Sequence, residues 1–256
     1  MKINYLHIGK TAGTSFRVSV QSNKKLNEII VYNSHKLRMP DVVKGKVLFA
    51  VRDPLSRFVS AFYHRQKKLR RHREEGMDST WYSNEIKSLD KYPDINMLLS
   101  DLFSENRKRN LSAKRAISNI MHLGIYGSYW YWFKSGKYLK SNIDRIYQVI
   151  RQENFNSDMI LLAEKLDAVP IEIAQTRVGD KKINPVESTY FERLLSYLKK
   201  EYEFIEILQE HQLLSKDYLK ERCQESRRHS LDFYHSELQG NSKLRRVKHF
   251  FSKVWQ

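Results

Sequence analysis

Two short segments of the chain combine residue types that bind anions. The first is a turn of small residues, Gly9–Ser15, in which Lys10 supplies a positive charge. Backbone N–H groups in such a turn can converge on a phosphate, and a following helix N-terminus adds its dipole. The second segment offers the guanidinium of Arg52 and the hydroxyl of Ser60, which together suit a second phosphate. These segments predict two separate anion sites.

Each segment also has an ordinary interpretation. The loop departs from the nucleoside-triphosphatase pattern G-x-x-x-x-G-K-[ST], because Lys10 precedes Gly13 and no Gly-Lys-Ser/Thr triplet closes it. It is therefore also compatible with a plain turn that carries a surface lysine. Arg52 and Asp53 are also compatible with a local ion pair that caps a helix. Two anion sites at neighbouring strand ends are less easily explained by these interpretations.

The elements that must position these residues follow from the apolar pattern. Four short apolar segments predict β-strands, at residues 3–8, 29–32, 47–51 and 145–150. Arg52 directly follows the third of them. Asp53 can cap a helix that begins at Pro54 and continues toward the basic stretch 67–73. This alternation of strands and helices is typical of an α/β fold.

The predicted fold is a P-loop-like three-layer domain, with a central, mostly parallel sheet flanked by helices. Residues 1–256 form one domain in this interpretation, because no convincing boundary interrupts them. Residues 66–115 form a helical and loop insertion, in which the polar stretch 74–93 is expected to be rich in loops. Helices are expected from Ser188 toward the C-terminus.

The combined motifs resemble the sulfotransferases that use 3′-phosphoadenosine 5′-phosphosulfate (PAPS), and most closely the branch that acts on carbohydrates. Residues 7–15, His-Ile-Gly-Lys-Thr-Ala-Gly-Thr-Ser, resemble that family's 5′-phosphosulfate loop, although the family often has proline where this chain has Gly9. Residues 51–60 resemble its 3′-phosphate motif. Residues 151–155 resemble a later strand end, and residues 177–185 resemble the loop that closes over the nucleotide. The resemblance covers roughly residues 3–210.

This resemblance implies an α/β sulfotransferase that transfers a sulfuryl group from PAPS to a carbohydrate hydroxyl, with PAP as the product and no metal. The carbohydrate is expected to be a surface polysaccharide or a glycolipid precursor. Lys10 would stabilise negative charge on the leaving oxygen. The residues implied to bind the nucleotide are Lys10, Thr11, Ala12, Gly13, Thr14, Ser15, Arg52, Ser60 and Lys182.

A base is also needed to take the proton of the acceptor hydroxyl. His35 is the first candidate, because related carbohydrate sulfotransferases use a histidine or glutamate after the second strand. The sequence also allows two other roles for His35: a polar loop residue, or a residue that binds substrate without taking a proton. His122 is the second candidate, and His64 is interpreted as structural or substrate-facing. The aromatic segment 126–133 is expected to be divided between core and a stacking surface.

Composition limits the remaining classes of function. The 256 residues include 46 Lys and Arg against 29 Asp and Glu, a formal net charge of +17, which indicates anionic partners. The single cysteine, Cys223, excludes an intramolecular disulfide and a cysteine-based zinc cluster. A P-loop kinase-like nucleotide enzyme is the alternative, but its closing lysine is missing. A nucleic-acid-binding protein is suggested only by charge, without a recognised motif, so no nucleic acid is expected.

The C-terminal segment 241–256 has the pattern of a basic amphipathic helix. Leu244, Val247, Phe250 and Phe251 recur at helical spacing among lysines and arginines. Such a helix can bind an anionic membrane surface, or it can dock its apolar side on the core. Because the chain starts directly in its first strand, we expect a bacterial cytoplasmic enzyme, peripheral on the inner face of the membrane if the tail binds lipid; a trimmed luminal protein is the alternative.

Overall fold

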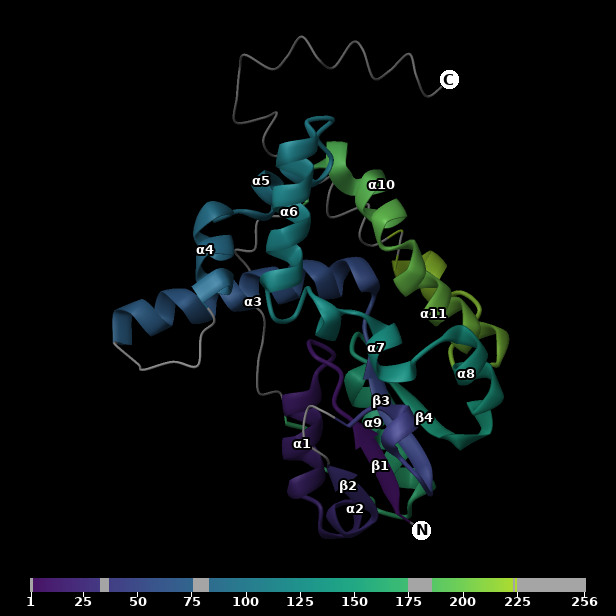
Figure 1. Ribbon diagram of the computed structural model, residues 1–256. Helices are drawn as coiled ribbons and strands as arrows, with labels where there is room; N and C mark the ends of the chain where they lie inside the picture. Colours follow the sequence, from purple (N-terminus) through teal and green to yellow (C-terminus); the bar gives the residue numbers. More distant parts are fainter. Residues whose placement is uncertain (1, 33–36, 76–82, 175–185, 223, 225–256) are drawn as a thin grey trace.

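The computed structural model describes residues 2–32, 37–75, 83–174, 186–222 and 224, and the fold within them is α/β. Four parallel strands form one sheet in the order β2-β1-β3-β4 (Figure 1). The strands are β1 (Ile3–Leu6), β2 (Ile30–Tyr32), β3 (Lys46–Val51) and β4 (Ile146–Arg151). All four coincide with predicted strands to within two residues at each end, so the apolar segments identified the sheet correctly.

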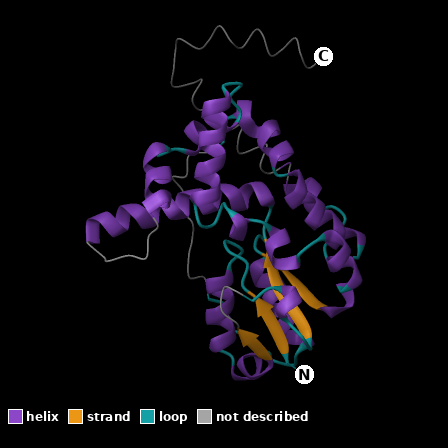
Figure 2. Cartoon of the chain, viewed as in Figure 1, coloured by secondary structure: helices purple, strands orange, loops and turns teal. Residues whose placement is uncertain are grey.

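Helices cover both faces of this sheet, which makes three layers (Figure 2). Side chains of β3 alternate between the faces: Val47, Phe49 and Val51 enter one core, and Leu48 and Ala50 enter the other. The first core is completed by α7 (Tyr129–Phe133), α8 (Gly136–Ser141) and α11 (Lys199–Glu210). The second is completed by α1 (Gly13–Gln21), α2 (Lys24–Ile29) and α9 (Phe155–Lys165).

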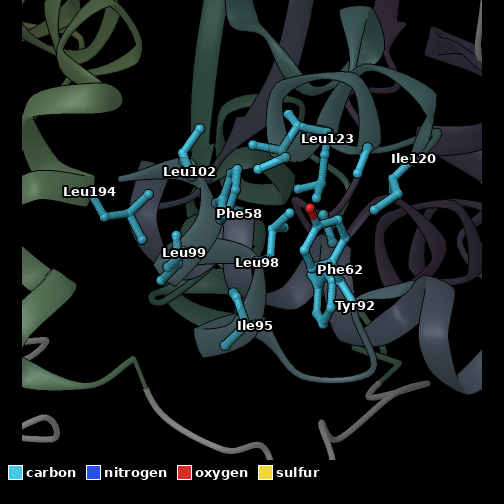
Figure 3. Close-up of a cluster of buried hydrophobic side chains, with 14 of the residues drawn as sticks. Phe58, Phe62, Tyr92, Ile95, Leu98, Leu99, Leu102, Ile120, Leu123 and Leu194 are labelled. Atoms are coloured by element: carbon cyan, nitrogen blue, oxygen red, sulfur yellow. The ribbon is translucent and has the colours of Figure 1, made fainter. Parts of the chain in front are cut away.

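A third apolar cluster joins the helices that lie beyond the sheet (Figure 3). It contains α3 (Pro54–Glu75), α4 (Ser83–Lys91), α5 (Ile95–Leu102), α6 (Arg107–Asn119) and α10 (Ser188–Tyr197). Short 3-10 helices lie at Met39–Asp41, Ile125–Gly127 and Ile143–Arg145. The segment 66–115 therefore contributes most of a helical subassembly with its own core.

Helix α4 corrects one expectation, because it lies within the polar stretch 74–93 that was predicted to be rich in loops. Part of its stabilisation comes from side chains of α3. The Arg65 guanidinium donates two hydrogen bonds of 2.7 Å to the buried carboxylate of Glu85, and Gln66 donates to the backbone carbonyls of Leu89 and Tyr92. A helix that depends on such tertiary contacts is not visible in the local apolar pattern.

The strand order places a topological switch point at the carboxyl ends of β1 and β3, the position at which open α/β sheets form a ligand crevice. From β1 the chain passes to β2 on one side, and it then crosses to β3 on the other side of β1. The loops that leave β1 and β3 therefore diverge, and open α/β sheets bind ligands at such a switch point. Both predicted anion-binding segments begin at this switch point.

Candidate functional site

The loop between β1 and α1 has an unusual backbone just before the N-terminus of α1. Lys10 and Ala12 both adopt left-handed conformations, with φ of 68° and 69°. The buried Thr11 hydroxyl donates to the carbonyl of Ile8 at 2.9 Å, which fixes the turn. Ala12 occupies the N-cap of α1, and no side-chain capping bond is present there. The start of α1 therefore lacks the internal cap that would compete with a bound phosphate.

Gly13 is required by the packing of a histidine against this loop. A Cβ atom at Gly13 would lie 2.3 Å from Nε2 of His7, closer than any real contact allows. The His7 ring is buried, and its Nδ1 is hydrogen-bonded to the Tyr32 hydroxyl on β2. His7 is thus a structural brace between β2 and the loop.

Arg52 lies at the end of β3, and its backbone N–H and carbonyl are both hydrogen-bonded to the Tyr129 hydroxyl. Its N–H donates to the Tyr129 hydroxyl at 3.0 Å, and that hydroxyl donates to the Arg52 carbonyl at 2.7 Å. The Nε–H group of its side chain is buried, and no acceptor for it is present among the described residues. Burial lowers the pKa of the Arg52 guanidinium, and the carboxylates of Glu153 and Asp53 only partly oppose this shift. Such a donor is well suited to an anionic ligand.

The carboxylate of Glu153, two residues past the end of β4, connects the 151–155 segment to the Arg52 segment. The Asp53 N–H donates to Glu153 at 2.9 Å, and the other Glu153 carboxylate oxygen accepts from the Tyr218 hydroxyl at 3.0 Å. Asp53 itself accepts from the Ser56 N–H at 2.7 Å, which caps α3 as predicted. The strand ends of β3 and β4 are therefore joined by side chains that hold Arg52 in place.

Ser60, His64 and His122 follow Arg52 in the sequence, and the two histidines lie next to each other in the structure. Ser60 and His64 are half-buried and one turn apart on α3. The His64 ring lies 5.7 Å, centroid to centroid, from the His122 ring. His122 packs on the loop between β1 and α1, because a Cβ at Gly9 would lie 3.0 Å from its Nδ1. Glycine at this position, where the resemblance expects proline, leaves room for the imidazole.

The structure brings His64 and His122 together, a pairing that the sequence did not predict. The i, i+4 spacing of Ser60 and His64 was the available signal, because it predicts one helix face. The approach of His122 to Gly9 joins residues more than a hundred positions apart and has no local signature. His64, interpreted from the sequence as structural or substrate-facing, is half-buried beside His122.

The remaining candidates are core residues or lie outside the described residues. His35, Lys182 and the tail 241–256 are outside them, so the structure places none of these. In the aromatic segment, Tyr129, Trp132 and Phe133 are buried in the sheet core, as an aromatic run at helical spacing usually is. Within the described parts of the chain, no cluster of three or more potential metal ligands occurs.

Comparison with known proteins adds no relative. No family model, no curated protein and no solved structure matches the chain. Among the residues that the structure describes, no helix is both long and apolar enough to span a bilayer. The two predicted anion-binding segments are therefore the basis for assigning a function.

Proposed function

We propose that this protein is a PAPS-dependent sulfotransferase that modifies a carbohydrate hydroxyl. The observation that carries the proposal is the pairing of two predicted anion-binding segments at one switch point of the sheet. The loop after β1 contains two left-handed residues and leads into α1, whose N-cap residue forms no side-chain cap. Arg52, which follows the adjacent strand β3, has a buried Nε–H without an acceptor among the described residues. A nucleotide with phosphate groups at its 5′ and 3′ positions fits two such sites better than ATP does, since ATP carries its phosphates in one chain.

The residues of the two segments have distinct roles in this proposal. The turn Lys10–Ser15 binds the 5′-phosphosulfate, and Arg52 with Ser60 binds the 3′-phosphate. The acceptor oxygen attacks sulfur, the bond between sulfur and the bridging oxygen breaks, and the electron pair goes to the leaving phosphate. Lys10 stabilises the charge that develops on that bridging oxygen, and a preorganised cation matters most at that moment.

The proton of the acceptor hydroxyl must pass to a base, and two histidines compete for this role. His35 is the candidate from resemblance, whereas His122 is supported by its contact with Gly9, next to Lys10. We expect substitution of the true base by glutamine to lower turnover by about 10²- to 10⁴-fold and to leave PAP affinity nearly unchanged. The comparison of His35→Gln with His122→Gln at saturating PAPS assigns the base. His211→Gln, at the exposed end of α11, is the matched control.

The proposal is tested by nucleotide binding and by transfer. Calorimetry with PAP, ADP and ATP should give the highest affinity for PAP, because only PAP offers the 3′-phosphate that Arg52 and Ser60 would bind. Incubation with labelled PAPS and a panel of glycans should then produce a labelled sulfate ester, identified by mass. Equal affinity for PAP and ADP contradicts the proposal, and tighter binding of ATP with Mg²⁺ favours the kinase-like alternative.

A further inference from the structure

One face of α3 leads from the proposed transfer site toward the end of the helix. Ser60, His64, Lys67 and Arg71 recur at spacings of three and four residues. At 3.6 residues per turn they fall within a sector of about 60°, and the axial distance from Ser60 to Arg71 is about 16 Å. We call these four residues the outer face of α3. It begins beside the switch point and continues along the helix away from it.

The opposite face of α3 is occupied by the helical subassembly. Phe58, Phe62, Arg65 and Leu69 point to that side and are all buried. Along the outer face, Ser60 and His64 are half-buried, whereas Lys67 and Arg71 are exposed. Figure 1 shows the C-terminal half of α3 extending beyond the bundle that α4, α5 and α6 form. The outer face therefore has surface available to a long ligand.

Positive charge dominates the exposed half of the helix. Its solvent-exposed cations, Lys67, Lys68, Arg70, Arg71 and Arg73, are opposed on α3 only by Glu74 and Glu75. Arg73 points toward α4, where it pairs with Asp90 at 2.8 Å. Arg71 lies 3.6 Å from Glu75, an exposed pair at i, i+4 spacing of the kind that an anionic ligand can replace. The outer face thus has net positive charge.

We infer that the outer face of α3 binds an acidic polysaccharide, the acceptor substrate, through its carboxylate or sulfate groups. This inference rests on the proposed function. His64 lies beside His122, which packs on Gly9, so the outer face is continuous with the loop between β1 and α1. A polyanionic chain that lies along Lys67 and Arg71 would place one of its sugars at the transfer site. An anionic membrane fits less well, because an interfacial helix needs an apolar side and this face is polar.

The test is a paired charge reversal with a matched control. The variant Lys67→Glu with Arg71→Glu changes the outer face. The control, Lys137→Glu with Lys199→Glu, changes the net charge equally at exposed positions on α8 and α11. Binding of uronate-bearing hyaluronan oligosaccharides is measured by calorimetry in the presence of PAP, with neutral dextran oligosaccharides, a single-stranded oligonucleotide and phosphatidylglycerol vesicles as further probes. Melting temperatures establish that both variants fold.

The expected result is hyaluronan affinity that falls as salt rises, because exposed charges are screened. The outer-face variant should lose at least about tenfold in that affinity, whereas the control and PAP binding should stay within about twofold. Three results overturn the inference: no hyaluronan binding by the parent, equal losses in both variants, or a selective loss for the oligonucleotide or vesicles alone. Failure of the proposed function is distinguishable, because it appears as absent preference for PAP or absent sulfate transfer while glycan binding is still measured.

Discussion

Arg52 offers the sharpest test of the proposed site, because function and stability should respond to its substitution in different ways. Substitution by methionine keeps most of the side-chain volume and removes the charge and the donors. The backbone hydrogen bonds between Arg52 and Tyr129 do not depend on the side chain, so they should persist in Arg52→Met. What changes is a guanidinium whose Nε–H is buried and has no acceptor among the described residues.

The expected sign of the stability change follows from the pKa shift of this group. Burial lowers the pKa of Arg52 even with Glu153 and Asp53 nearby, which means that folding disfavours its charged form. Removal of the charge should therefore leave the free energy of unfolding unchanged or raise it. Affinity for PAP should fall, since a hydrogen bond to a charged group contributes about 1.5–3 kcal/mol, or about 10- to 100-fold in the dissociation constant. ADP, which lacks the 3′-phosphate, should bind the variant and the parent almost equally.

Arg57 provides the matched control, because it is a structural arginine on the same helix. Its guanidinium donates to the Gly127 carbonyl, lies 3.3 Å from the Glu201 carboxylate and covers the Tyr129 ring at 3.8 Å. Arg57→Met leaves the largely buried Glu201 without its cation, and breaking a buried pair in this way costs about 3–5 kcal/mol. The two substitutions should thus differ in their effect on stability by several kcal/mol.

The assays are urea unfolding and calorimetry with PAP and ADP on the parent and both variants. Two results would refute the reasoning. A loss of more than about 1 kcal/mol of unfolding free energy in Arg52→Met, comparable to a net hydrogen bond, would make Arg52 a structural residue. An unchanged ratio of PAP to ADP affinity would remove Arg52 from the 3′-phosphate site.

Three further predictions concern the loop and the core behind it. Lys10→Ala should lower turnover at saturating PAPS by about 10²- to 10³-fold and weaken PAP binding far less, and an unchanged rate constant would exclude Lys10 from the mechanism. Gly13→Ala should destabilise the protein by about 1–3 kcal/mol, because its Cβ would collide with the His7 ring, and unfolding midpoints measure this loss. Burial raises the pKa of Tyr129 to about 12, above its ordinary value of about 10. The contribution of neutral Tyr129 to the free energy of unfolding should therefore be complete below about pH 10. It should decrease by up to about 1.4 kcal/mol for each pH unit between about pH 10 and pH 12. Urea unfolding at several alkaline pH values should show a smaller decrease in Tyr129→Phe than in the parent.

The fold, and the position of the two predicted anion-binding segments at the ends of β1 and β3, were predictable from local patterns. Apolar segments of four to six residues are strand signals, and Asp53 followed by Pro54 marks the start of α3. Arg52 could be placed at a strand end by the same reasoning, because it directly follows a continuous apolar run. These predictions succeeded because each depends on residues that are close in sequence, where propensity and periodicity act.

The contacts that complete the site depend on the tertiary structure, because they join residues distant in sequence. The Tyr129 hydroxyl that holds the Arg52 backbone comes from a segment that sequence patterns could not divide between core and site. The placement of His122 against Gly9 has no sequence signal either. Each contact exists because the sheet order brings the ends of β1 and β3 together under helices from later in the chain. Residue types and local spacing thus predicted two anion sites, whereas packing decided which side chains surround the two segments.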